Sequence, residues 1–114
     1  MSTYKSTDTE RKGKVVYNAG IVKGIVALAV SDVNGASLRK IGKKDNLDLI
    51  KISFNGDDVD VDVSVDIEYG YNVPDVAYEI QRSVKQNVES MSKYKVNSVD
   101  VHFEGVSFPT EIID

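Results

Sequence analysis

The 114-residue chain contains no cysteine and no tryptophan, and it has only two prolines and one histidine. Without cysteine there is no disulfide framework, no thiolate metal site and no thiol nucleophile, a composition compatible with a reducing cytoplasm. A chain of this length forms one domain and buries roughly two-thirds of its unfolded surface without such cross-links. We therefore expect a single domain that is stabilised by its apolar core.

Long apolar runs and an excess of positive charge are also missing. The longest apolar run, residues 24–30, is far shorter than the roughly 20 residues of a membrane-spanning helix. The polar segment 1–13 lacks the apolar core of a signal peptide and is predicted to be a disordered tail. The net charge of -4 and the pI near 4.9 disfavour nucleic acid and anionic lipid as partners. We expect a cytoplasmic protein with no nucleic-acid partner and no direct membrane insertion.

The clearest structural signal is a hairpin turn at Asn55-Gly56, the residue pair that best tolerates the positive φ angles of a type I′ turn. With these two residues as the loop, apolar side chains pair on one face of the hairpin and charged side chains pair on the other. The expected partners are Phe54 with Asp57, Ile52 with Val59, Ile50 with Val61, and Lys51 with Asp60.

The second strand of the hairpin alternates strictly between apolar and polar residues, which indicates one buried and one wet face. The expected buried face carries Val59, Val61, Val63, Val65, Ile67 and Tyr69. The expected wet face carries Asp58, Asp60, Asp62, Ser64, Asp66 and Glu68. Because ionised carboxylates are costly to bury, helices should cover only the valine face.

A long helix is predicted after Gly70. Asn72 can accept hydrogen bonds from the first turn, Pro74 lacks an N–H that this turn cannot satisfy, and Asp75 suits the positive end of the helix dipole. Apolar residues at three- and four-residue steps predict a buried stripe of Val76, Ala77, Ile80, Val84, Val88 and Met91. A closing strand should turn Val99, Val101 and Phe103 inward, and Asp100, His102 and Glu104 outward.

The first half of the chain predicts a strand at 14–17, a helix after Asn18, a strand at 36–41 and a loop at 43–48. The apolar stripe of that helix is Ile21, Val22, Ile25, Val26, Ala29 and Val33. Residues 14–114 should thus form one α+β domain in the order β-α-β-β-β-α-β. Its sheet should be mixed and mostly antiparallel, with both helices on one face. We expect a C-terminal tail from about residue 105 that either folds over the core or forms an exposed apolar edge for association.

Two acidic patterns could carry chemistry. The row of aspartates could supply oxygen ligands to calcium, but alternate residues on one strand lie about 7 Å apart and do not converge on one ion. A solvated face that discourages edge aggregation is the preferred interpretation. His102, flanked by Asp100 and Glu104, could form an acid–base cluster, although a surface histidine without a nucleophile motif is the simpler interpretation.

Two further patterns are weak. Gly20 and Gly24 lack the Lys-Ser/Thr ending of a phosphate-binding loop, so close helix packing is the expected role. Tyr69 and Tyr71 flank Gly70 and could stack on a ligand, but anchoring in the core is commoner, and no basic stripe accompanies them. The sequence therefore assigns no catalytic, cofactor-binding or metal-binding residue.

A set of short motifs runs through the chain: Gly13-Lys14-Val15, Tyr69-Gly70, Asn72-Val73-Pro74, Val76-Ala77, Ile80-Gln81, Val84-Lys85, Val88-Glu89-x-Met91, Val99-x-Val101 and Gly105-Val106. Taken together, these motifs resemble those of the alkaline shock protein family of Gram-positive bacteria, also called the general-stress, envelope-associated family. The chain departs from the family at Ser92-Lys93, where threonine and glycine are usual, and its first helix is richer in glycine.

The resemblance implies a non-secreted bacterial protein that self-associates and is linked to envelope stress or membrane-lipid homeostasis. It also implies that a separate small anchor protein holds some members at the membrane, and it brings no catalytic residues. We expect a non-enzymatic, homo-oligomeric scaffold or adaptor without a cofactor. Its partners would be a small membrane anchor protein or an enzyme of lipid metabolism. The alternative is a regulatory protein that binds a small ligand or a divalent metal on the acidic sheet face.

Overall fold

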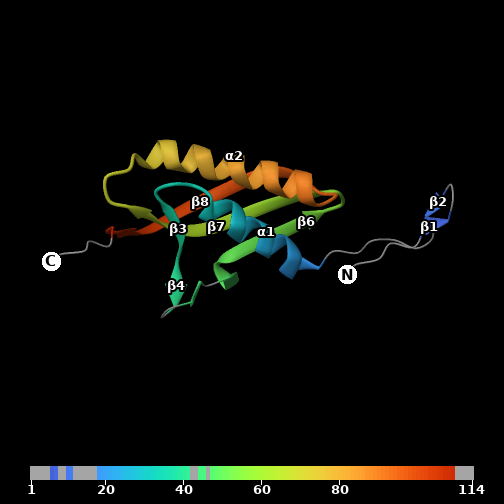
Figure 1. The fold of residues 1–114 in the computed structure, drawn as a ribbon, viewed down its shortest axis with the longest axis horizontal. Coiled ribbons are helices and arrows are strands. Elements are labelled where there is room, and N and C mark those ends of the chain that lie inside the picture. The colour runs from blue at the N-terminus through green and yellow to red at the C-terminus, as the bar shows by residue number, and fades with distance from the viewer. Residues whose placement is uncertain (1–5, 8–9, 12–17, 42–43, 46, 110–114) are drawn as a thin grey trace.

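The structure, a computed structural model, describes residues 6–7, 10–11, 18–41, 44–45 and 47–109 (Figure 1). Its main sheet is organised around the central strand β7 (Asp58–Glu68). One edge of β7 pairs antiparallel with β6 (Ile50–Asn55) and, further along, with β3 (Ala36–Leu38). The other edge pairs in parallel with β8 (Lys95–Ser107) over the whole length of β7.

Helices α1 (Ala19–Ser31) and α2 (Val73–Met91) cover one face of this sheet (Figure 1). From α1 onward the elements follow the predicted order in a mixed, mostly antiparallel sheet, so the α+β class is confirmed. The predicted first strand at 14–17 lies outside the described residues. Within the described ranges, neither helix combines the length and the apolarity needed to span a bilayer.

The core lies between the valine face of β7 and the apolar stripes of the two helices. Removing these side chains from water stabilises the fold by about 25 cal/mol per Å² of apolar surface. The described part of the chain buries no polar or charged side chain. The core contains Val59, Val61, Val63, Val65 and Ile67 of β7, Val22, Ile25, Val26, Ala29 and Val30 of α1, and Val76, Ile80, Val84 and Val88 of α2.

Three residues that were predicted to be buried are exposed instead. Tyr69 is 68% exposed because β7 ends at Glu68 and the chain then turns at Gly70, which has a φ of 101°. Ile21 and Met91 lie in terminal turns of their helices, where the apolar periodicity continues but less of the protein covers the side chain.

The hairpin between β6 and β7 is present, but its register differs from the prediction by two residues. The turn residues are Gly56-Asp57 instead of Asn55-Gly56, and Gly56 takes the positive φ of 63°. Asn55 remains in the strand, where its side-chain amide donates to Asp60 at 3.3 Å. Moving the turn by one residue moves each partner by two, so every side chain keeps its predicted face. The observed partners are Phe54 with Val59, Ile52 with Val61, Ile50 with Val63, and Lys51 with Asp62.

Both helices begin after an asparagine, as predicted. Asn18 Oδ1 accepts a hydrogen bond from the Ile21 N–H at 3.0 Å, and Asn72 Oδ1 accepts one from the Asp75 N–H at 3.0 Å. At the other end of α2, Glu89 Oε2 accepts a hydrogen bond from the Val96 N–H at 2.9 Å. The last turn of α2 therefore fixes the start of β8.

The segments around the core differ from the predictions in several places. The predicted strand at 36–41 is divided into β3 and β4 (Lys40–Ile41). The predicted loop at 43–48 contains β5 (Lys44–Asp45), which pairs with β4, and the start of the 3-10 helix η1 (Leu47–Leu49). Within residues 1–13, β1 (Ser6–Thr7) pairs with β2 (Glu10–Arg11). β8 extends to Ser107, past the start of the predicted C-terminal tail, because β7 offers partners as far as Glu68.

Candidate functional site

The polar face of the sheet, opposite the helices, carries the acidic side chains of β7. Asp60 Oδ1 accepts hydrogen bonds from Asn97 Nδ2 at 2.9 Å and from Ser98 Oγ at 2.8 Å. These two bonds from β8, with a weaker one from Asn55, lower the pKa of the Asp60 carboxyl below its usual value. Asp60 is thus an ionised acceptor that ties β8 to β7.

His102 makes its polar contact with Asp62, and not with the acidic neighbours on its own strand. His102 Nε2 lies 2.9 Å from Asp62 Oδ2, a residue 40 positions earlier in the chain. The hydrogen bond and the charge of Asp62 raise the pKa of His102, and the charges of Glu104 and Asp100 add smaller contributions. The acid–base cluster of these three β8 residues, which the sequence left as the less favoured interpretation, does not form a contact set, since same-face neighbours on one strand stand about 7 Å apart.

Ser64 is the residue directly opposite His102 in the parallel ladder. A serine beside a histidine–aspartate pair has the composition of a nucleophilic site, but such a site requires a hydrogen bond between the hydroxyl and the imidazole. Among the described residues no hydrogen bond joins Ser64 to His102, and Asp62 already occupies Nε2. The arrangement does not activate a nucleophile.

Arg39 covers the far end of the same face. Arg39 lies between β3 and β4, and its Nη1 forms an ion pair with Asp66 Oδ1 of β7 at 2.9 Å. A Cβ atom at Gly105, which is opposite Asp66 on β8, would lie 2.9 Å from Arg39 Nη1 and 3.0 Å from Asp66 Oδ1. Because Gly105 has no side chain, the Arg39 guanidinium can occupy the space above it.

The acidic ladder does not converge on one point. Asp60, Asp62 and Asp66 face Asn97 and Ser98, His102, and Arg39, respectively. In the part of the chain that the structure describes, no three side chains of His, Asp or Glu lie close enough together to hold a metal ion. The metal alternative thus finds no ligand set on this face.

A second candidate surface lies where β7 and β8 end. The rings of Tyr69 and Phe108 stack with centroids 5.4 Å apart, although they are 68% and 70% exposed. Val106, which precedes Phe108 at the end of β8, is 55% exposed. We call Tyr69, Val106 and Phe108 the apolar end. The expectation that Tyr69 anchors the core is wrong, because its ring lies on the surface against Phe108.

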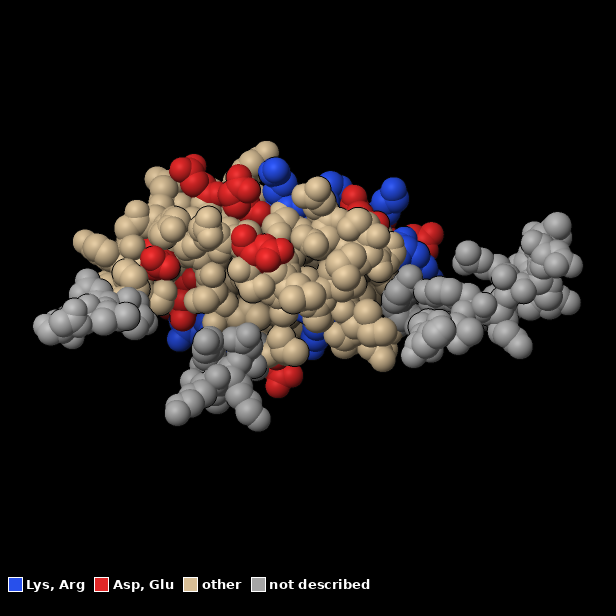
Figure 2. Space-filling model, viewed as in Figure 1, with Lys and Arg blue, Asp and Glu red and all other residues tan. Residues whose placement is uncertain are grey.

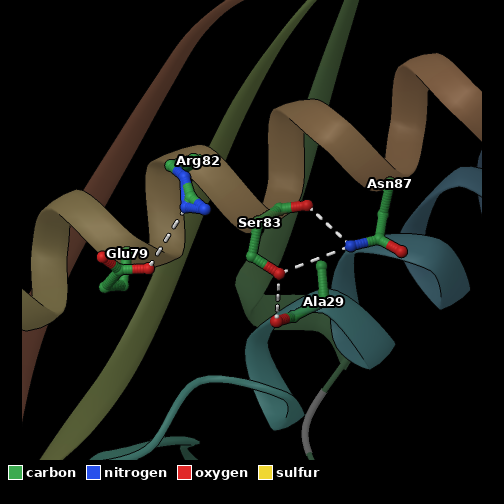
Figure 3. A network of polar contacts seen from close by, with 5 residues as sticks. All are labelled: Ala29, Glu79, Arg82, Ser83 and Asn87. Carbon is green, nitrogen blue, oxygen red and sulfur yellow. Dashed lines mark hydrogen bonds and ion pairs between the residues drawn. The ribbon is translucent and has the colours of Figure 1, made fainter.

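A third candidate is a groove of about 460 Å³ between the end of α1 and the first half of α2. The helices are joined beside it by Ser83 Oγ, which donates to the Ala29 carbonyl oxygen at 2.8 Å (Figure 3). Within α2, Asn87 Nδ2 donates to the Ser83 carbonyl oxygen at 2.8 Å (Figure 3). The polar groups that line the groove are of both signs, and Glu79 pairs with Arg82 at 3.8 Å (Figure 3). This helix-covered face shows no continuous basic stripe over its described part (Figure 2).

Gly20 and Gly24 of α1 do not serve close helix packing. A Cβ atom at Gly24 would meet no atom within 4 Å, and one at Gly20 would meet only Asn18 Oδ1 at 3.2 Å. The expected role of this pair is therefore wrong. The sequence did not predict the contact of Asp62 with His102, the ion pair of Arg39 with Asp66, or the space that Gly105 leaves beside that pair. The registers of β3 and β8 on β7 bring these residues together.

The fold and these surfaces define a class: a small two-layer α+β domain whose sheet face is internally paired and whose apolar end is open. Residues 7–108 match the alkaline shock protein family, which is described as having a cell envelope-related function, and the chain belongs to this family. The resemblance that the sequence motifs indicate is thereby confirmed.

Two relatives of the chain are proteins of Gram-positive bacteria. It is 24% identical over 109 residues to the uncharacterized protein YqhY of Bacillus subtilis, a match that covers 87% of this chain and 81% of YqhY. It is 27% identical over 108 residues to the uncharacterized protein Spy1535 of Streptococcus pyogenes, covering 86% and 82%. A solved structure of MamM-CTD is similar with a TM-score of 0.49 and 19% identity, covering 77% of this chain and 98% of that one.

Proposed function

We propose that this protein is a non-enzymatic scaffold of cell envelope-related function that acts by associating with itself and with other proteins. The single observation that carries the proposal is the apolar end. Tyr69 and Phe108 stack on each other and still present most of their surface to water. Contiguous exposed apolar groups of this kind are typical of interaction sites and are otherwise an aggregation hazard.

The polar groups of the sheet face support a non-catalytic role. Asp60, Asp62 and Asp66 are held by hydrogen bonds or ion pairs within the domain. The bonds of Asp60 and Asp62 cross from β7 to β8, and the ion pair of Asp66 joins β7 to the residue that follows β3. The main effect of these contacts is to align the strands. The family description supports the link to the cell envelope. As partners besides a second copy, we propose a small membrane anchor protein or an enzyme of lipid metabolism.

The test is the molar mass of the purified chain by multi-angle light scattering across the micromolar range. We expect the mass to rise with concentration, and the combined Tyr69→Ser and Phe108→Ser substitutions to reduce that rise. The matched control is Tyr78→Ser, since Tyr78 is 62% exposed but lies on α2, away from the apolar end. A chain that remains a monomer at every concentration contradicts the proposal.

The alternative, a regulator that binds a small ligand or a divalent metal, is tested by thermal unfolding. Binding to the folded state raises the melting temperature by mass action. A rise with calcium, magnesium or a nucleotide would favour the alternative. The scaffold proposal predicts no rise with any of these probes.

A further inference from the structure

In the part of the chain that the structure describes, the outer edge of β8 is the longest open strand edge. β8 pairs on one side with β7, and among the described residues no strand pairs with its other side. The N–H of Lys95 donates to the Asp57 carbonyl oxygen, and the N–H of Tyr69 donates to the Ser107 carbonyl oxygen. In a parallel ladder, the residues between such bonding positions direct their N–H and C=O to the opposite side. The register of β8 on β7 shifts at Asn97 and at Glu104, and each shift changes the phase of this alternation. Between the two shifts, the outward groups are therefore those of Val99, Val101 and Phe103.

One contact supports this assignment. Gln81 of α2 donates its side-chain amide to the Val99 carbonyl oxygen at 3.1 Å, a contact made on the side of β8 that faces away from β7. A carbonyl oxygen has two lone pairs, so this bond leaves room for a second donor. The edge is thus accessible to a backbone partner.

Two β-bulges delimit the edge. The register of β8 on β7 shifts at Asn97 and again at Glu104, each of which is an extra residue in β8. Bulges interrupt ladder pairing and protect an edge from indiscriminate association. Regular pairing is left to residues 98–103.

We propose that a second copy of this chain pairs antiparallel with this edge, with a two-fold axis that passes through Val101. This inference rests on the proposed self-association and assigns its interface. Val101 then faces Val101 of the second copy, and Val99 faces Phe103. All three residues direct their backbone groups outward, so these positions become hydrogen-bonded pairs of an antiparallel ladder.

Charge selects this register from its neighbours. With the axis at Val101, Asp100 of each copy faces His102 of the other, and this happens twice by symmetry. With the axis at Asp100, two aspartates face each other, and with the axis at His102, Asp100 faces Glu104. Like charges that are directly opposite destabilise strand pairing, whereas unlike charges stabilise it.

The pairing also covers the apolar end. Beyond the central stretch, one strand passes the bulge at Asn97 while the other passes the bulge at Glu104, so the two extra residues offset each other. Val96 of one copy then lies opposite Val106 of the other. Phe108 of one copy then lies near Tyr94 of the other. Within each copy the ring of Tyr94 packs against Phe54, with ring centroids 5.1 Å apart. One interface therefore accounts for both the open edge and the exposed apolar end.

Because the chain has no cysteine, introduced cysteines report the register without background. Residues 100 and 102 of opposite copies form a non-hydrogen-bonded pair with Cα atoms about 4.5 Å apart, within the range of a disulfide. A mixture of Asp100→Cys and His102→Cys chains should give a cross-linked dimer under mild oxidation. Either variant alone should not, because its cysteines are then a diagonal pair about 7 Å or more apart. Lys51→Cys, on β6, is the control for random collision.

Each outcome decides the matter. Cross-linking in the mixture alone supports the proposed register. Cross-linking of Asp100→Cys alone or of His102→Cys alone overturns it. Association by light scattering without any of these cross-links overturns the interface but leaves the proposed function, whereas a monomer at every concentration overturns both.

A charge variant provides an independent measurement should His102→Cys fail to fold. Asp100→Lys places two positive pairs across the axis, and we expect the dimer dissociation constant to rise about tenfold. Asp32→Lys makes the same change of charge after the end of α1 and should leave the dissociation constant unchanged. Equal effects of the two variants would overturn the proposal.

Discussion

The ring of Tyr71 lies directly on the α-carbon of Gly35. A Cβ atom at Gly35 would stand 2.5 Å from Cδ2 and 2.6 Å from Cγ of that ring. The carbonyl oxygen of Gly35 also accepts a hydrogen bond from the Glu68 N–H at 2.8 Å. One short turn therefore holds the end of α1, the end of β7 and the approach to α2 together.

Gly35→Ala should destabilise the protein by about 2 to 4 kcal/mol, because the methyl group strains both the backbone and the packing. Gly35 has a φ of 91°, a conformation that residues with a side chain rarely adopt. Urea unfolding measures the free energy of unfolding. In α1, Gly24→Ala is the matched control and should stabilise by about 0.5 to 1 kcal/mol, since a Cβ there meets open space and alanine favours helix. Equal stability of Gly35→Ala and the parent chain would contradict this prediction and would show that the Tyr71 ring moves away at no cost in free energy.

Gly105→Ala should weaken the ion pair between Arg39 and Asp66. The added Cβ would lie 2.9 Å from Arg39 Nη1, so the guanidinium must move away. We expect a loss of about 0.5 kcal/mol, because the ion pair is partly exposed. A double-mutant cycle with Arg39→Ala, followed by urea unfolding, checks the cause. An undiminished effect of Gly105→Ala in the Arg39→Ala background would assign it to the backbone of β8 instead.

The pair of His102 and Asp62 should make stability depend on pH. Because the pKa of His102 is raised in the folded state, its contribution is fully present below the unfolded pKa of about 6.5 and is lost as pH rises through the folded value. The stability difference between the parent chain and His102→Gln should therefore grow as pH falls from about 8 to about 6. Chemical denaturation at a series of pH values measures this difference.

Asp62→Asn separates this pair from the other charges around His102. The imidazole also senses Glu104 and Asp100 of β8, which remain in this variant. An NMR titration of the imidazole protons should show a pKa above the ordinary value in the parent chain and a clear decrease in Asp62→Asn. An unchanged titration would mean that the two β8 carboxylates, and not Asp62, set the pKa of His102.

Much of the layer arrangement follows from local sequence patterns. The alternation in β7 predicts the valine face, and the asparagines before α1 and α2 predict where both helices start. The predicted hairpin register differs from the observed one by two residues because Asn55-Gly56 is compatible with two turn positions. The two residues can form the turn themselves, or Asn55 can end the strand while Gly56 begins the turn, as observed. The choice depends on strand ends that no local pattern specifies. Periodicity alone likewise placed Tyr69 in the core, although the strand had already ended.

The contacts of the sheet face depend on long-range register and were not predictable from spacing. His102 has acidic residues two positions away on both sides, yet the residue that it contacts lies on β7. Alternation shows which face a side chain occupies but not which strand lies beside it or where a bulge shifts the partner. Gly105 is a further example, since the need for a glycine arises from Arg39, which lies far away in the sequence between β3 and β4.

Val88 and Met91 of α2 share one predicted apolar stripe but differ in the structure, and this difference can be measured. Val88 is fully buried, whereas Met91 is 53% exposed in the last turn before the chain leaves for β8. Val88→Ala should lower the free energy of unfolding by about 2 to 3 kcal/mol through lost burial and a residual cavity. Met91→Ala should change it by less than about 0.5 kcal/mol, because an exposed side chain loses little on truncation. Urea unfolding of the two variants under identical conditions makes the comparison. A large loss for Met91→Ala in the monomer range would place the methionine in the core, whereas a loss that appears only at high concentration would place it in an interface between copies.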